Sequence, residues 1–453
     1  MDILTSATSP RTTTAAWTEE PGRRAGWPGA EWASWALGHG IARAGLRVGV
    51  RRGDPFARLE MDPELRADPY PGYESLRHTG VIVRGQVVSG TVSHAACTEI
   101  LRSTAFGVAD GGAPMPPAWR RLRRSLMRVD QYGPLDPPSM LAVDPPLHTR
   151  YRRLVSHDFA VKSVAALEDR VRGVARRLLD EIEGRGSVDL VGEYAARLPV
   201  VIIGDLLGVP AKQHDDLLRW GDDAARLLDP TMSWREYRRV VAGVGQLHAW
   251  FDGHVERLRR ESEDNLMSRL VDLEGEDALT THELRAMGLL LLGAGFETTV
   301  NLIGNAVGLL FEHPDQRAVL REDPSRWATA VDEALRMESP VQLTVRQAYE
   351  DTQVQGEPVR AGTTMLVMLA GANRDPEVFA DPARFDVTRA NAGQHLAFSS
   401  GAHFCPGAGL ARLEGRVALE ELFARFPGLR PDGVARRRPN RVLRGWQYLP
   451  VAV

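Results

Sequence analysis

Apolar residues recur at helical spacing through most of the middle of this 453-residue chain, from about residue 144 to residue 311. Recurrence at intervals of three and four residues places apolar side chains on one face of an α-helix. Alternation with a period of two, which is typical of β-strands, is confined to short stretches near residues 80–92, residues 351–370 and the C-terminal tail. The pattern therefore predicts a mainly α protein with small β-sheets.

The strongest helical signal is a long apolar stretch in the second half of the chain. Thr280 followed by Glu283 has the spacing of a capping box, and His313 before Pro314 closes the segment. Its centre, MGLLLLGAGFETTVNLIGNAVGLL, is apolar on nearly every face, which is typical of a helix buried in a large domain. A membrane span is disfavoured because Glu297 interrupts the stretch. We therefore expect a core helix that carries a buried acid.

The N-terminal segment has a different composition. The first thirty or so residues are rich in Thr, Ser, Pro, Gly and Arg, lack the apolar stretch of a signal peptide, and are expected to be disordered. Residues 32–50 mix apolar side chains with arginines and glycines, which favours a helix packed on the main body over one on a membrane surface. The chain is thus divided into an N-terminal extension, residues 1–57, and one large domain, residues 58–453. A Gly- and Pro-rich loop is expected at residues 107–146.

Charge and cysteine content narrow the class of protein. The net charge of −3 and the mixture of signs give no reason to expect a nucleic-acid partner. Two cysteines, Cys97 and Cys405, cannot form a disulfide framework, a zinc cluster or a four-cysteine iron–sulfur site. A reducing compartment suits such a chain, so the cytoplasm is the expected location.

Cys405 lies in the stretch FSSGAHFCPGAGLAR, directly before a helical pattern. Pro406 suits the first helical position, and Gly407 allows the backbone to come close to whatever the sulfur contacts. The free N–H groups at a helix start favour an anion such as a thiolate, which is the form that binds metal. The alternative is a buried structural cysteine, since an isolated free cysteine usually behaves as a small hydrophobe.

This stretch resembles the haem-binding loop of the cytochromes P450, in which the cysteine is the axial ligand of the iron. Ser399 stands where that family more often has glycine. The resemblance implies that Cys405 binds the haem iron and that Cys97 is a helix residue without a role at the iron. The residues that carry the resemblance are Phe398, Gly401, His403, Cys405 and Gly407, followed by Leu410, Ala411 and Arg412.

The core helix contains a second motif, AGFETT, from Ala294 to Thr299. A buried carboxylate beside a threonine is either a satisfied structural pair or a working one. The motif resembles the oxygen-binding groove of the P450 central helix. The resemblance implies that Thr298 hydrogen-bonds the dioxygen substrate and that Glu297 relays protons from solvent.

A third motif is the spacing Glu-x-x-Arg, formed by Glu333 and Arg336 on one helix face. As a surface pair it would contribute little to stability. In cytochromes P450 the same spacing is a buried pair that is joined by an arginine from a later loop and braces the cysteine-bearing segment. By resemblance, Arg384 is that third partner.

Further basic residues match the positions that bind the two haem propionates in the family. A lone arginine or histidine is usually a solvated surface residue, but arginine also gives strong forked hydrogen bonds to carboxylates. The matching residues are His148, Arg152, Arg346 and His403.

The walls of a substrate pocket are also implied by the resemblance, and they are mostly apolar, which implies a hydrophobic substrate. The residues concerned are Leu290, Gly293, Ala294, Val341, Gln342, Thr344 and the tail segment 442–445, which includes Leu443.

The resemblance runs from about residue 60 to the C-terminus. It implies a cytochrome P450 fold with haem b (iron protoporphyrin IX) between the central helix and the cysteine-loop helix, and a monooxygenase that uses O₂. No nucleotide-binding Gly motif follows a strand, so a ferredoxin and its reductase are the expected electron donors, docking near Arg150, Arg153 and Arg416. The alternatives are a peroxide-driven P450, against which Glu297 and Thr298 argue, and a non-catalytic haem-bound ligand carrier or sensor.

Overall fold

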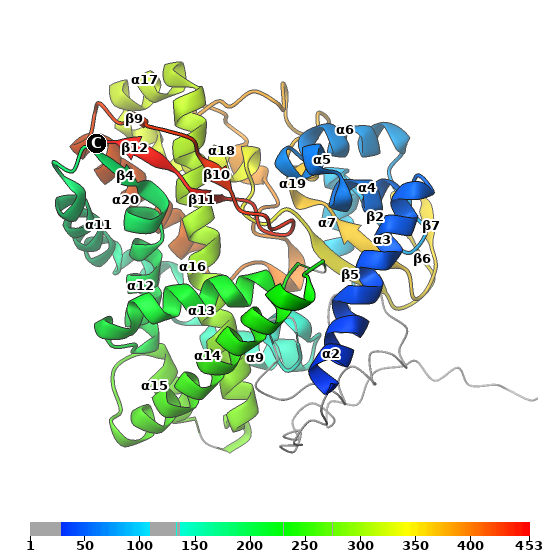
Figure 1. Ribbon diagram of the computed structural model, residues 1–453, viewed down its shortest axis with the longest axis horizontal. Coiled ribbons are helices and arrows are strands. Elements are labelled where there is room, and N and C mark those ends of the chain that lie inside the picture. The colour runs from blue at the N-terminus through cyan, green and yellow to red at the C-terminus, as the bar shows by residue number, and fades with distance from the viewer. Residues whose placement is uncertain (1–28, 109–132, 134–135, 230, 274) are drawn as a thin grey trace, which may run out of the picture.

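The computed structural model describes residues 29–108, 133, 136–229, 231–273 and 275–453 (Figure 1). Helices make up most of the described chain, and the strands form small sheets. The prediction of a mainly α protein with small β-sheets is confirmed. The predictions for the first 28 residues and for most of the Gly- and Pro-rich loop fall outside the described residues.

The helices are α2 (Ala30–Trp35), α3 (Ile41–Arg51), α4 (Pro55–Met61), α5 (Pro63–Ala67), α6 (Tyr70–Thr79), α7 (His94–Arg102), α9 (Leu147–Ser156), α10 (Val161–Ala165), α11 (Glu168–Ile182), α12 (Arg197–Leu207), α13 (His214–Arg226), α14 (Trp234–Arg260), α15 (Leu266–Val271), α16 (Thr281–Glu312), α17 (Pro314–Glu322), α18 (Trp327–Met337), α19 (Leu369–Ala372) and α20 (Ala408–Arg425). Short helical turns are η1 (Ala36–Gly40), η3 (Met140–Ala142), η4 (Val191–Ala195), η5 (Ala211–Gln213), η6 (Gly275–Asp277), η7 (Pro324–Arg326), η8 (Ala392–Gln394) and η9 (Gly401–His403).

The strands are β1 (Val83–Arg84), β2 (Ser89–Thr91), β3 (Phe106–Gly107), β4 (Ser187–Asp189), β5 (Thr344–Ala348), β6 (Thr352–Val354), β7 (Glu357–Val359), β8 (Thr364–Val367), β9 (Arg430–Pro431), β10 (Arg436–Arg437), β11 (Trp446–Tyr448) and β12 (Pro450–Ala452).

Helix α16 runs through the middle of the molecule (Figure 1). Thr280 caps its N-terminus, and both hydrogen bonds of the capping box with Glu283 are present. The 32 residues of α16 give a length of about 48 Å at 1.5 Å per residue. The helix is long and apolar enough to cross a membrane, but 72% of its most apolar window is buried inside the protein. The prediction of a core helix with these boundaries is confirmed.

Most strands lie where the sequence alternates with a period of two, but β3, β4 and β5 lie outside the predicted stretches. The largest has five strands in the order β1-β2-β8-β5-β3, with β2 and β8 parallel and the other neighbours antiparallel. A three-stranded sheet, β4-β12-β9, fixes the C-terminal strand against the segment that follows α11. The C-terminal tail is therefore an integral part of the fold.

The main hydrophobic core surrounds α16 and includes side chains from α11, α12, α18 and α20. Helix α20 approaches α16 closely at Gly415, where an added Cβ would lie 3.0 Å from Leu302. A second core packs under the five-stranded sheet and contains Cys97, which is buried in α7. The prediction that Cys97 is a helix residue is confirmed.

The N-terminal extension packs on the segment between α13 and α14. The indole Nε1 of Trp35 donates to the carbonyl of Met232 at 3.0 Å, and Arg43 donates to the carbonyl of Thr231 at 2.8 Å. The ring of Trp35 also lies 5.8 Å from that of Trp234. The prediction of a helix packed on the main body is confirmed for α2 and α3.

Candidate active site

Cys405 sits at the end of a loop that leads into α20. Its backbone N–H donates to the carbonyl of Phe398 at 2.9 Å, which closes the loop. The helix begins at Ala408 with Gly407 as N-cap, so the expectation that Pro406 opens it was wrong by two residues. A Cβ on Gly407 would lie 4.0 Å from the Cys405 sulfur, so the backbone here approaches the thiol closely.

The electrostatic surroundings of the thiol act in opposite directions. Burial raises the pKa of Cys405, whereas the Gly407 N–H and the guanidinium groups of Arg152 and Arg412 lower it. The thiolate is thus stabilised by one backbone donor and two cations, and opposed by loss of hydration. A metal cation bound to the sulfur would reverse the effect of burial.

The cysteine loop contains two left-handed residues. Gly401 has φ 69°, and a Cβ there would lie 2.2 Å from the Leu101 carbonyl oxygen, so only glycine fits. Ser399 has φ 63°, a conformation that costs a residue with a Cβ on the order of 1 kcal/mol. Ser399 therefore stands at a position that favours glycine because its backbone is left-handed.

The four basic residues predicted at the haem edge come together, although they lie in separate segments. The rings of His148 and His403 are 4.1 Å apart. The pKa of His148 is lowered to about 4, first by burial and then by the charges of His403, Arg152 and Arg346. These residues therefore form one cluster, in which His148 is uncharged at neutral pH beside the two arginines.

This cluster lacks enough acidic partners of its own. Within the described residues, neither Arg152 nor Arg346 has a carboxylate within the 4.0 Å of an ion pair, and burial lowers the pKa of both. Among the residues that the structure describes, Arg346 donates only to Thr344 Oγ1 and the Val345 carbonyl. The one nearby acid is Asp144, 3.8 Å from His403 Nε2. A ligand with two carboxylates, such as haem with its propionates, fits this set of donors.

The middle of α16 has an open face in an otherwise buried helix. Ala294 is exposed, Gly293 and Thr298 are partly exposed, and a Cβ on Gly293 would meet no atom within 4 Å. The Thr298 hydroxyl donates to the Ala294 carbonyl at 3.0 Å, as is common for threonine in a helix. This face has room for a ligand beside a hydroxyl group.

Glu297 points to a different environment. It is 2% exposed, and its carboxylate lies 2.9 Å from the guanidinium of Arg438 in the C-terminal tail. Arg438 also contacts Asp222 of α13. Burial raises the pKa of Glu297, and Arg438 opposes this rise. Sequence reasoning missed Arg438 because no local spacing connects the tail with α16.

Glu297 and Arg438 border a polar cavity of ≈ 250 Å³. The cavity lies between the N-terminal helices, α13, the start of α14 and the tail. Its other lining residues are Arg43, Met61, Arg66, Asp222, Ala225, Arg226, Asp229, Thr231, Met232, Glu236, Pro439, Asn440 and Gln447.

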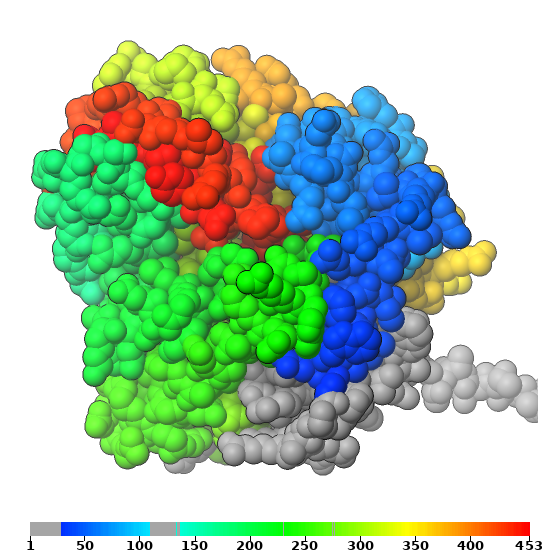
Figure 2. Space-filling view, in the orientation of Figure 1, coloured from blue at the N-terminus to red at the C-terminus, as the bar shows by residue number. Residues whose placement is uncertain are grey.

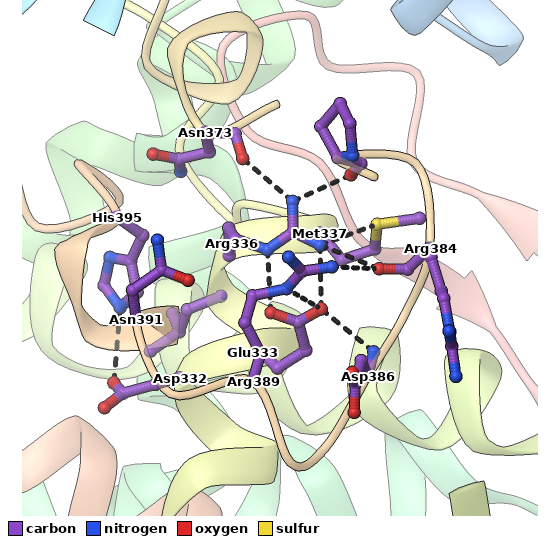
Figure 3. A network of polar contacts seen from close by, with 12 residues as sticks. Asp332, Glu333, Arg336, Met337, Asn373, Arg384, Asp386, Arg389, Asn391 and His395 are labelled. Carbon is purple, nitrogen blue, oxygen red and sulfur yellow. Dashed lines mark hydrogen bonds and ion pairs between the residues drawn. The ribbon is translucent and has the colours of Figure 1, made fainter. Parts of the chain in front are cut away.

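The Glu-x-x-Arg pair is buried, as the resemblance implies, but its third partner differs from the prediction (Figure 3). Arg336 donates to both carboxylate oxygens of Glu333 at 2.7 Å. The second arginine on Glu333 is Arg389, at 3.1 Å. Arg384 contributes only its carbonyl oxygen, which accepts from Arg336 at 3.0 Å. The assignment of the Arg384 side chain was therefore wrong, because the two arginines lie five residues apart in one loop and sequence spacing does not fix which one turns inward.

The predicted pocket walls are partly brought together. Val341 and Leu443 form an isolated antiparallel bridge, and Leu290 is buried in α16. The Gln342 side chain is bonded inside the core to Tyr73 and to the Ser339 carbonyl. The hydroxyl of Thr344 accepts from Arg346.

Known proteins are similar to this chain in sequence and in fold. A profile of the cytochrome P450 family matches residues 222–441. The chain is 46% identical over 424 residues to cytochrome P450 140 of Mycobacterium tuberculosis, which covers 92% of this chain and 97% of that protein. It is 43% identical over 317 residues to the 6-deoxyerythronolide B hydroxylase of Saccharopolyspora erythraea, covering 68% of this chain and 76% of the hydroxylase.

Solved structures give the same answer. The crystal structure of ligand-free Mycobacterium smegmatis CYP164A2 is 36% identical, covers 88% of this chain and 99% of its own, and superimposes with a TM-score of 0.78. That of P450BioI in complex with an acyl carrier protein ligated to hexadec-9Z-enoic acid is 31% identical with a TM-score of 0.79, covering 86% and 100%. The residues around Cys405 and the extent of these matches lead to one conclusion: the chain belongs to the cytochrome P450 family.

Proposed function

We propose that this cytochrome P450 monooxygenase inserts one oxygen atom of O₂ into a hydrophobic small molecule, with two electrons from a separate redox protein. Members of the family bind haem b as cofactor. The observation that carries the proposal is the convergence of four basic residues, short of acidic partners, near a thiol at the start of α20. In this proposal Cys405 is the iron ligand, and Phe398 and Gly407 complete its loop.

The haem, once bound, supplies the redox chemistry that activates O₂. The protein contributes binding and orientation: Arg152, Arg346, His148 and His403 hold the two propionates by charge-assisted hydrogen bonds. The open face at Ala294 leaves space for O₂ and substrate.

Proton delivery is assigned to Glu297 and Thr298. The Thr298 hydroxyl lies on the open face, and the carboxylate of the preceding residue borders the polar cavity. Burial raises the pKa of Glu297, so this carboxyl group holds a proton more readily than an exposed glutamate and can pass it on. Glu297 thus takes protons from the cavity, and Thr298 donates a hydrogen bond at the place where oxygen is reduced.

The substrate is expected to be apolar. Leu290, Val341 and Leu443 offer hydrocarbon walls, and one relative is named as a hydroxylase of 6-deoxyerythronolide B. A screen of such compounds for a low-to-high spin shift of the haem would identify the class.

A small acidic ferredoxin is proposed as the electron donor, and the cytoplasm as the location, since both cysteines are free thiols. The three arginines proposed for docking already have carboxylate partners, which reduces their net attraction. These pairs are Arg150 with Glu283 at 2.9 Å, Arg153 with Asp277 at 2.5 Å and Arg416 with Glu168 at 2.8 Å.

The docking proposal is tested by the rate of reduction at increasing salt. Arg153 has the most exposed of these side chains, at 66%, so Arg153→Gln should slow reduction at low salt and have little effect at high salt. Arg47→Gln, which removes an exposed arginine from α3, is the control. A reduction rate that does not change with salt would contradict docking by charge.

The central test uses carbon monoxide with the reduced protein. The wild type should show the red-shifted Soret band of a thiolate-bound haem, and Cys405→Ser should lose it, whereas Cys97→Ser should keep it. A thiolate band that survives in Cys405→Ser would overturn the assignment. Substrate-dependent consumption of reduced cofactor through a ferredoxin then separates an enzyme from a ligand carrier.

A further inference from the structure

A second, smaller cavity lies where the C-terminal tail crosses α5 and the segment after α18. Figure 2 shows the orange-to-red tail on this face, between the blue N-terminal helices and the green helices. The free space has ≈ 10 Å³ for the centre of a water-sized group. No residue of its lining is acidic in the part of the chain that the structure describes. The lining consists of Arg66, Arg437, Arg438, Arg441 and Arg444 with Gln342, Asn440 and Gly445.

Four of the five arginines in this lining have carboxylate partners, and Arg438 has two, Glu297 at 2.9 Å and Asp222. Glu338 pairs with two others, Arg444 at 2.7 Å and Arg437 at 3.5 Å, and also with Arg374 outside the lining at 3.7 Å. Arg66 forms a longer ion pair with Asp229, at 3.8 Å. Within the described residues Arg441 alone of the five forms no ion pair, so the charge of the lining is least balanced at that residue.

Arg441 is the least compensated of the five. It is 6% exposed, and its Nη2 has no hydrogen-bond partner among the described residues. Its Nη1 has one long bond of 3.4 Å, to the Leu65 carbonyl. Glu60 is an acid that interacts electrostatically with Arg441. Burial and the charge of Asp229 raise the pKa of Glu60 to about 7, so this carboxyl group is only partly charged at neutral pH.

A buried guanidinium without a partner is unfavourable, and water alone would satisfy its N–H groups without balancing its charge. Fixed guanidinium and amide donors that face one small space are the chemistry that recognises halides and carboxylates. We infer that this cavity binds a small monovalent anion, either a free ion of halide size or the carboxylate end of an acyl compound. The anion would link α5, the segment after α18 and the tail.

Thermal unfolding of the holoprotein tests the site directly. The probes are sodium chloride and sodium formate, at an ionic strength held constant with the bulky sulfonate MES. A bound anion should raise the Tm saturably, by about 1–3 °C for a chain of this size. Arg441→Gln should abolish this rise, and Arg66→Gln, at a less buried position, should weaken it if the first variant folds poorly. Arg47→Gln, an exposed arginine outside the cavity, should leave it unchanged.

A second measurement distinguishes the source of the anion. If the carboxylate belongs to a ligand of the haem pocket, dodecanoic acid should produce the spin-state shift at a lower concentration than its methyl ester does. Arg441→Gln should then weaken binding of the acid at least tenfold and leave binding of the ester unchanged. If the anion is free, both compounds should respond alike while chloride still raises the Tm. The inference is overturned if neither chloride nor formate stabilises the wild type and Arg441→Gln raises the Tm equally in every salt. The thermal readout does not depend on the proposed activity.

Discussion

Two buried glutamates differ in their surroundings: Glu333 lies in a network of fixed donors, and Glu297 is the residue proposed to relay protons. Glu333 is 0% exposed and receives two N–H groups of Arg336, one of Arg389 and the backbone N–H of Asp386 (Figure 3). Glu297 is 2% exposed and has one arginine, Arg438, which it shares with Asp222.

The difference lies in how many fixed donors surround the carboxylate. The Glu333 carboxylate is surrounded by fixed N–H donors, and its replacement by a neutral group would leave two guanidinium groups unbalanced. A carboxylate with one shared partner and a polar cavity beside it can gain and lose a proton at lower cost. Both carboxylates are buried, so the number of donors, and not burial, is what distinguishes Glu333 from Glu297.

The largest effect is expected from removing the charge of Glu333, the carboxylate with the larger number of fixed donors. Glu333→Gln should cost about 3–5 kcal/mol of stability, because it leaves buried arginines without a counter-charge. The variant should accumulate little haem-bound protein, as measured by the carbon monoxide spectrum and by the Tm.

Two arginine variants supply the matched control for this brace. Arg389→Gln should destabilise the protein by a few kcal/mol, whereas Arg384→Gln, whose side chain is outside the network, should stay within about 0.5 kcal/mol. Equal losses in the two variants would contradict the assignment of Arg389.

For Glu297 and Thr298 the expected effect is on turnover. Glu297→Gln should lower turnover by about 10²–10⁴-fold with normal haem content, because general acid catalysis is lost. Thr298→Ala should instead continue to oxidise cofactor while releasing hydrogen peroxide in place of product. Haem content, cofactor oxidation and peroxide yield are measured on both variants. Parallel loss of haem in the two would show that these residues are structural.

Glu414 extends the comparison to an acid with no partner. It is buried in α20, its Oε2 has no hydrogen-bond partner in the described structure, and burial raises its pKa from 4.5 to about 8. A raised folded-state pKa means that its contribution to stability is present below pH 4.5 and is lost as the pH rises through 8. Glu414→Gln should therefore gain about 2–4 kcal/mol over the wild type at alkaline pH and little at pH 4.

The measurement is urea unfolding across pH, with the exposed Glu256→Gln as control. Parallel curves for Glu414→Gln and the wild type would show that Glu414 titrates normally.

The smallest effect is expected at Ser399, where the buried polar group is neutral. Ser399 is left-handed, and its buried hydroxyl has no partner within the described residues. Ser399→Gly should raise stability by about 0.5–1 kcal/mol, because it relieves the backbone and removes the hydroxyl, partly offset by greater freedom of the unfolded chain. Ser399→Ala separates the two contributions, and a loss of stability in Ser399→Gly would show that the hydroxyl is needed.

The sequence was most informative where the signal is local. The capping box of Thr280 and Glu283 and the apolar faces of α16 depend on residues a few positions apart, and the structure places both as expected. The haem-edge residues were found only by resemblance to the family, since nothing in their separate segments indicates that they meet.

Pairs between distant segments could not be read from the sequence. The partner of Glu297 comes from the tail and that of Glu333 from a loop with two candidate arginines. Which arginine turns inward depends on the path of the loop in three dimensions. The arginine-lined cavity was missed for the same reason, because its residues come from α5 and the tail.

The ≈ 250 Å³ cavity is bordered by residues from α3 and from the C-terminal tail, around the carboxylate that is proposed to relay protons. Arg43 reaches it from α3 and Arg438 from the tail, and both meet the space that borders Glu297. In a chimera with a relative, the ends would therefore have to be exchanged together. A hybrid that takes the N-terminus from one parent and the tail from the other would leave the middle of the chain intact and still change the surroundings of Glu297.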